Sequence, residues 1–179
     1  MEPLTIRIVM TPEAIRKIYD YTYWAFERVW NCICQLTDEQ FTQELGYSSG
    51  SIRHHVIHMI SSHHRWVNRL KGEEVLPHLN IKDYSSLTAV KAKWDEAKAE
   101  FLDFIYSLDQ AQLDEVVRYE IASRGVVSSS QQWEVLLHLA NHAMDHRSQI
   151  LAMLHQQFGV QTVEQDMIFF LWGEDVNQG

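Results

Sequence analysis

Residues 129–158 contain neither glycine nor proline, the two residue types that most often interrupt a helix. Apolar side chains recur along this segment every three or four positions, which is the spacing of one face of an α-helix. One stripe consists of Val135, Leu139, His142, His146, Ile150 and Met153. Ser129 or Ser130 is a suitable N-cap, and Gly159 a suitable C-cap. The sequence therefore predicts one long helix that needs other helices to cover its apolar stripes.

Three further segments show the same periodicity and begin with helix-start residues. They run from Thr11 to about Leu36, from Ser51 to Lys71, and from Ser85 or Ser86 to about Leu108. Residues 37–50 and 72–83 are predicted to be connections. With only 7 glycines and 3 prolines in the chain, we expect an all-α fold. The four long helices predict a four-helix bundle in a single domain over residues 1–179.

Short extra segments surround the predicted bundle. Residues 116–119 and 125–127 are rich in valine and can form short extended pieces. The apolar tail Met167–Trp172 is expected to dock on the bundle. These segments leave the all-α class unchanged.

Charge and composition exclude several classes of protein. The net charge is −9 with histidines neutral, and an acidic surface repels nucleic acid. No apolar run reaches the length of a membrane span, and the N-terminus lacks a signal-peptide pattern. Cys32 and Cys34 point to different faces of a predicted helix, so no disulfide is expected between them. We therefore expect a cytoplasmic protein that binds neither nucleic acid nor a membrane.

Histidine is the unusual residue of this chain, which has ten. His142 and His146 occupy core positions of the long helix, one turn apart on one face. Two buried imidazoles are costly unless their nitrogens are satisfied, and a shared metal ion satisfies them. His138 lies one turn earlier and is expected at the edge of the bundle or in a supporting position. The alternative interpretation is ordinary packed core histidines without a metal.

A second histidine cluster lies between positions 54 and 64, in the second predicted helix. His63 shares the apolar stripe of that helix, whereas His58 lies on a neighbouring stripe with His55 and the small residue Ser62. Periodicity therefore leaves open whether His58 or His63 is a third ligand. His54 and His64 are expected at the surface.

The chain resembles the DinB/YfiT-like superfamily of metal-dependent enzymes. The resemblance rests on Tyr23-Trp24-Ala25-Phe26-Glu27-Arg28, on Ser51-Ile52-Arg53 followed by His58 and Trp66, and above all on Asn141-His142 followed by His146-Arg147-Ser148-Gln149. The family motif usually has glycine at the position of Ser148. The resemblance implies a four-helix bundle, often a homodimer, and a metal ion held by His58, His142 and His146. His63 then becomes a neighbour of the pocket.

Three neutral histidines without a cysteine suggest an open site that keeps a water molecule or substrate on the metal. Zinc or nickel suits imidazole ligands, and such an ion can activate water or a low-molecular-weight thiol. We therefore expect a hydrolase or a thiol S-transferase that acts on a small molecule. The alternative is a non-catalytic metal-binding, stress- or damage-inducible protein in which the ion mainly stabilises the bundle, since the name of the family it resembles comes from damage-inducible genes.

Other metal chemistries lack their residues in this sequence. Ala143 stands where an HExxH peptidase needs its glutamate, and Glu134 precedes His138 by four residues where a di-iron motif needs three. Asp145 and His63 are the nearest general-base candidates, although Asp145 is expected to face water or form an ion pair. No catalytic residue follows from the sequence.

Overall fold

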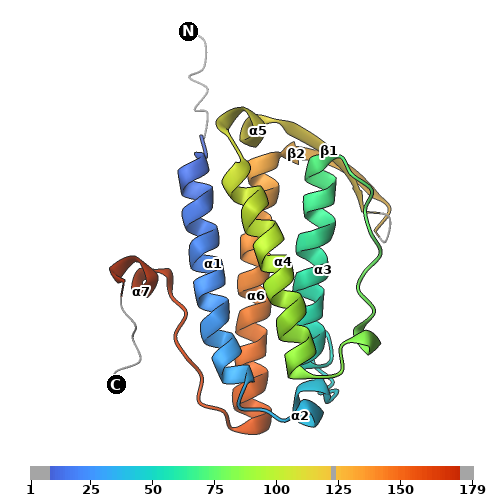
Figure 1. Cartoon of the computed structure of the whole chain (residues 1–179), viewed down its shortest axis with the longest axis vertical. Helices are drawn as coiled ribbons and strands as arrows, with labels where there is room; N and C mark the ends of the chain where they lie inside the picture. Colours follow the sequence, from blue (N-terminus) through green and yellow to red (C-terminus); the bar gives the residue numbers. More distant parts are fainter. Residues whose placement is uncertain (1–8, 122–123, 174–179) are drawn as a thin grey trace.

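The structure is a computed structural model that describes residues 9–121 and 124–173. Its elements, in chain order, are α1 Pro12–Ile33, α2 Asp38–Thr42, α3 Ile52–Lys71, the 3-10 turn η1 Ile81–Asp83, α4 Leu87–Ser107, α5 Gln110–Asp114, β1 Val116–Ile121, β2 Val126–Gln131, α6 Gln132–Phe158 and α7 Met167–Trp172. The long helices α1, α3, α4 and α6 pack side by side (Figure 1). The predicted all-α four-helix bundle is therefore confirmed.

The helix-start residues explain where three of the long helices begin. The side chains of Thr11, Ser51 and Ser86 each accept a hydrogen bond from a backbone N–H in the first turn of α1, α3 and α4. At the other end, Gly72 and Gly159 close α3 and α6 with a left-handed backbone, at φ of 70° and 65°. These boundaries agree with the prediction to within a few residues.

The predicted start of the fourth helix is wrong. Ser129 and Ser130 belong to strand β2, where they pair with Arg118 and Val117 of strand β1. The helix begins only at Gln132, with Gln131 as its N-cap residue. Residues 37–50 also contain a short helix, α2, which begins with a capping box at Thr37. The serines satisfied the pattern of a helix cap, but their backbones hydrogen bond within the hairpin instead.

The order of the helices decides where the connections run. α1 and α6 run in one direction and α3 and α4 in the other, so the segment from α3 to α4 returns along the outside of the bundle (Figure 1). The hairpin β1–β2 crosses the end of the bundle where α3 ends and α6 begins. The return segment runs along the length of α3, where Arg53 bonds to the Tyr84 carbonyl near the helix start, and the hairpin lies near the C-terminal end of α3.

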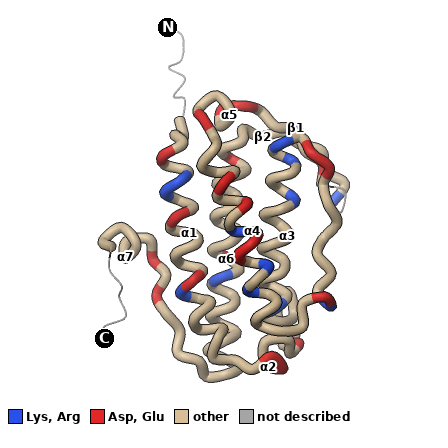
Figure 2. The backbone as a smooth tube through the Cα atoms, in the orientation of Figure 1, with Lys and Arg blue, Asp and Glu red and all other residues tan. Residues whose placement is uncertain are grey.

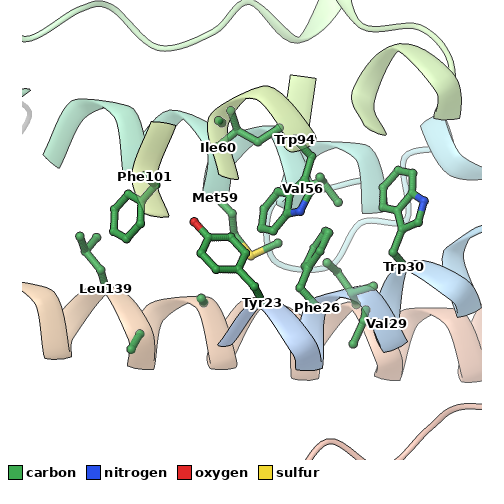
Figure 3. Close-up of a cluster of buried hydrophobic side chains, with 14 of the residues drawn as sticks. Tyr23, Phe26, Val29, Trp30, Val56, Met59, Ile60, Trp94, Phe101 and Leu139 are labelled. Atoms are coloured by element: carbon green, nitrogen blue, oxygen red, sulfur yellow. The ribbon is translucent and has the colours of Figure 1, made fainter. Parts of the chain in front are cut away.

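The core is aromatic between α1 and α4 and aliphatic toward α3 and α6 (Figure 3). Phe26 of α1 stacks on Trp94 of α4 with ring centroids 3.5 Å apart. Tyr23 lies edge-on to Trp94, and its hydroxyl points toward α3. Burial of such large side chains is worth about 1.5–3 kcal/mol each and fixes how the helices face one another.

Charge is unevenly distributed among the helices. α3 carries four basic side chains and no acidic one, and Figure 2 shows these basic positions on a chain that is acidic overall. Among the described residues, none of the helices combines the length and the apolar character that crossing a membrane requires. Cys32 is buried and Cys34 exposed, and both are free thiols, as predicted.

The tail contacts the bundle through α1. Phe170 of α7 packs on Tyr21 and Trp24, with centroids 6.0 and 5.8 Å apart. No residue of α7 is itself buried. The segment before α7 is held more closely, since Val160 is buried and the Gln165 backbone carbonyl accepts a hydrogen bond from Tyr21. The predicted docking thus depends mainly on residues 160–165.

Candidate metal centre

Three histidines from two helices converge inside the bundle. The Nε2 atom of His142 lies 3.2 Å from Nε2 of His58 and 3.1 Å from Nε2 of His146. His58 comes from α3, and the other two come from consecutive turns of α6. Val135, Leu139 and Ile150 of the same stripe are buried, so the packing of α6 turns both of its histidines inward. These three side chains form a group that could hold a metal ion.

The separations suit a common ion. Two nitrogens that each lie about 2.0–2.1 Å from one metal, at an angle of about 100–110°, are about 3.1–3.4 Å apart. Both measured Nε2–Nε2 distances fall in that range. The third pair, His58 and His146, lies within 4.8 Å, so the three residues present could hold a divalent metal.

Hydrogen bonding alone leaves these nitrogens poorly satisfied. A neutral imidazole has one N–H donor and one acceptor nitrogen. Nε2 of His142 faces two other Nε2 atoms, and a single proton or lone pair pairs well with only one of them. Its Nδ1 atom is buried without a partner. A shared metal resolves this conflict, because each Nε2 can then direct its lone pair at the ion.

His55 supports one member of the group, and the sequence did not predict this. It is fully buried in α3, and its Nδ1 atom lies 2.8 Å from Nδ1 of His146. One of these two atoms must carry the proton. If Nε2 of His146 binds a metal, its Nδ1–H donates to His55, which fixes the ring orientation of His146. The only available signal was the shared stripe of His55 and His58 in the sequence.

Burial keeps these imidazoles neutral. Desolvation lowers the pKa of His142, His146 and His55 to about 4, with the neighbouring histidines adding to the shift. The pKa of His58 is lowered in the same way, with His78 and His54 as secondary causes. Metal ligation requires neutral imidazole. The site is therefore in its ligating protonation state at neutral pH.

The other candidate residues take different positions. His63 is buried, and its Nδ1 lies 3.3 Å from the hydroxyl of Tyr23, away from the convergent group. His138 is exposed beside His142, with ring centroids 6.0 Å apart. Asp145 is exposed and accepts a hydrogen bond from Gln149. In the described structure, the side-chain hydrogen bonds of Asp145 and His63 are therefore to other residues and not to the three converging Nε2 atoms.

A cavity opens beside His58. It has a volume of about 420 Å³ and lies between α3 and the return segment 78–81. His78 of that segment lies parallel to the His58 ring, with centroids 6.2 Å apart and planes 19° apart. The segment is fixed to α3 by a hydrogen bond from the Leu79 N–H to the hydroxyl of Ser61. A small molecule can thus reach the His58 side of the group.

Comparison with known proteins agrees with this geometry. The sequence model of the DinB family matches residues 10–178. The chain is also 28% identical over 145 residues to Protein DinB of Bacillus subtilis (strain 168), an alignment that covers 78% of this chain and 84% of the relative. The residues matched by the family model include both α3 and α6, the helices that supply the converging histidines. On this basis the resemblance seen in the motifs is confirmed, and the chain belongs to the DinB family.

Proposed function

We propose that this protein is a metalloenzyme in which His58, His142 and His146 hold a divalent ion that activates water or a low-molecular-weight thiol. The observation that carries the proposal is the convergence of three imidazoles: Nε2 of His142 lies 3.2 Å from Nε2 of His58 and 3.1 Å from Nε2 of His146, and the ligand atoms of all three lie within 4.8 Å of one another. Among the described residues, the group contains no carboxylate or thiolate, so an ion there would keep its full charge. Three protein ligands with one open position are typical of catalytic zinc sites.

The chain's own residues would perform three tasks. The imidazoles of α6 and α3 hold the ion, and His55 orients His146. The aromatic and aliphatic core around them excludes water from one side. The cavity beside His58 admits a small molecule from the other. A divalent ion bound in this way lowers the pKa of a coordinated water or thiol toward neutrality.

Zinc or nickel is the proposed ion, because imidazole nitrogen is a ligand of intermediate softness that suits both. The test is elemental analysis of protein purified without a histidine tag. We expect one equivalent of metal in the wild type and loss of metal in His58→Ala, His142→Ala and His146→Ala. His138→Ala is the matched control, since it removes an exposed histidine from the same face of α6. Metal-free wild type after reconstitution with zinc or nickel would refute the proposal.

A non-catalytic metal protein is the second candidate. The histidine group joins α3 to α6 in the middle of the bundle, so an ion could act mainly as a cross-link. A ligand that binds only the folded state raises its stability by mass action. If chelation unfolds the protein, and no thiol changes the spectrum of the cobalt-substituted form, the structural role is favoured. A fold that survives chelation, together with thiol binding to the metal, favours the enzyme.

A further inference from the structure

A second, smaller cavity adjoins the proposed metal site. It has a volume of about 110 Å³ and is lined by Ser62, Arg65, Trp66, Arg69, His78 and Ile121. Most of these residues come from the C-terminal half of α3, and Ile121 from the end of strand β1. This size suits a small group such as a carboxylate, not a whole substrate.

Two of the lining residues connect this cavity to the converging histidines. The hydroxyl of Ser62 lies 3.4 Å from Nε2 of His58, the proposed ligand atom. His78 lines both this cavity and the larger one beside His58, and it lies parallel to the His58 ring. A ligand with one end at the metal can therefore extend past Ser62 and His78 to the arginines.

The arginines in this cavity have unused hydrogen-bonding capacity. Within the described part of the chain, neither Arg65 nor Arg69 forms an ion pair, although acidic residues outnumber basic ones by 24 to 15 in the sequence. Arg65 donates to the Leu76 carbonyl and Arg69 to the Arg65 carbonyl, which occupies one nitrogen of each. The Nε atom of Arg69 is buried without a partner.

Trp66 holds one of these guanidinium groups in place. The Arg69 guanidinium lies over the Trp66 ring, 4.9 Å from its centroid. Such stacking fixes the plane of the guanidinium group and leaves the N–H groups at its edge free to donate hydrogen bonds. Two like charges in a cavity whose lining includes no acidic residue are best stabilised by an anion.

We propose that Arg65 and Arg69 bind a carboxylate of the substrate or thiol whose reactive atom is placed at the metal. This carboxylate site rests on the proposed function, because it says which charge is carried by the molecule that reaches the metal ion. It selects acidic thiols over neutral thiols of similar size. An arginine fork matches the two oxygens of a carboxylate, so each arginine adds directional hydrogen bonds as well as charge.

The test compares two thiols on the cobalt-substituted holoprotein through the sulfur-to-cobalt charge-transfer band. Mercaptopropionate carries a carboxylate, and mercaptoethanol is neutral. We expect the wild type to bind mercaptopropionate at least about tenfold more tightly, and Arg65→Gln and Arg69→Gln each to reduce that preference about tenfold. Mercaptoethanol binding should not change in either variant. Lys71→Gln is the matched control, since Lys71 is on the same helix but lies over the Phe104 ring.

The outcomes separate this proposal from the proposed function. Equal affinity for both thiols in the wild type, or an equal loss of both in Arg69→Gln, overturns the carboxylate site. If neither thiol produces the charge-transfer band, the proposal that the metal activates a thiol fails.

The arginine cavity is then tested without the metal. Succinate is titrated into the metal-free protein, and its binding is followed by NMR through the arginine Nε–H signals. Shifts of Arg69 that are lost in Arg65→Gln support the cavity, and unmoved signals reject it.

Discussion

At the scale of single residues, His55 gives His146 a neutral hydrogen-bond partner, and this affects the net charge of the proposed metal site. A metal-bound histidine usually donates its second N–H to a carboxylate or a backbone carbonyl. Here the atom facing Nδ1 of His146 is Nδ1 of another imidazole, at 2.8 Å. An imidazole acceptor is neutral, so the proposed site keeps more of the positive charge of the ion than it would with a carboxylate. A more positive site lowers the pKa of a bound water or thiol further.

We predict that His55→Phe weakens zinc binding by about 10–100-fold, the effect usual for loss of a hydrogen-bond partner behind a metal ligand. His55→Asn should lose less, because its side-chain oxygen can accept the same N–H. Zinc affinity is measured by competition with a chromophoric chelator. His54→Asn is the control, since His54 is the exposed neighbour on α3. Wild-type affinity in a correctly folded His55→Phe protein would show that His146 needs no acceptor.

At the scale of elements, Arg147 explains part of the motif that identifies the family. It follows His146 directly in α6, is fully buried, and contacts two other segments. Its Nε donates to the Gln165 side chain at 2.8 Å and its Nη1 to the Thr22 carbonyl at 3.3 Å. The guanidinium also lies over the Tyr21 ring. The arginine of the motif therefore ties α6 to α1 and to the tail, and it directly follows one histidine of the proposed metal site.

We predict that Arg147→Ala lowers the free energy of unfolding by on the order of 3 kcal/mol, because it removes two hydrogen bonds of a charged group. It should also speed amide hydrogen exchange in residues 160–172 more than in the rest of the chain. Both are measured on one sample by denaturant titration and exchange mass spectrometry. Arg16→Ala is the control, since Arg16 bonds to the carbonyls of Tyr106 and Leu108, away from the tail. A uniform rise in exchange for both variants would contradict the anchoring role.

The elements also show which parts of this protein can be predicted from sequence. The stripe of Leu139, His142, His146 and Ile150 was predictable, because helical periodicity alone decides which side of α6 is buried. The pairing of Ser129 and Ser130 in the hairpin was not, because it depends on Arg118 and Val117, which lie more than ten residues earlier in the sequence and leave no sign in the local pattern of the serines. His58 was separated from His63 only by family resemblance, since both lie near the inner face of α3. For His55 the sequence offers only its shared stripe with His58, which does not indicate the contact with His146 of α6.

The structure leaves little apolar surface of α6 exposed for the predicted homodimer. A second apolar stripe of α6 includes Leu136, Ala140, Met144 and Leu154, and a stripe that one core cannot cover would offer a surface to a partner. Leu136, Ala140 and Leu154 of that stripe are buried within the single chain, and only Met144 is largely exposed. α7 adds the exposed Ile168, Leu171 and Trp172. The homodimer stays a prediction, and light scattering after size exclusion measures it: a monomer at micromolar concentration would contradict it.

At the scale of the whole molecule, stability depends on keeping histidines neutral in the interior. Desolvation lowers the pKa of His63, which is fully buried, to about 3, and the pKa values of His55, His142 and His146 to about 4. In the unfolded chain each of these side chains titrates near 6.5. Between about pH 6.5 and pH 4, the unfolded state therefore binds protons that the folded state does not. Stability is fully present above pH 6.5 and falls as the pH falls through this window.

We predict that the metal-free protein loses stability steeply between pH 6.5 and pH 4.5, with each such histidine contributing up to about 1.4 kcal/mol per pH unit. The measurement is urea unfolding at several pH values in this window. His63→Gln should reduce the slope by up to one proton, because glutamine does not titrate and can still bond to the Tyr23 hydroxyl. If His63→Gln and wild type show the same slope, His63 binds protons equally in the folded and unfolded states, and its burial against Tyr23 does not hold it neutral.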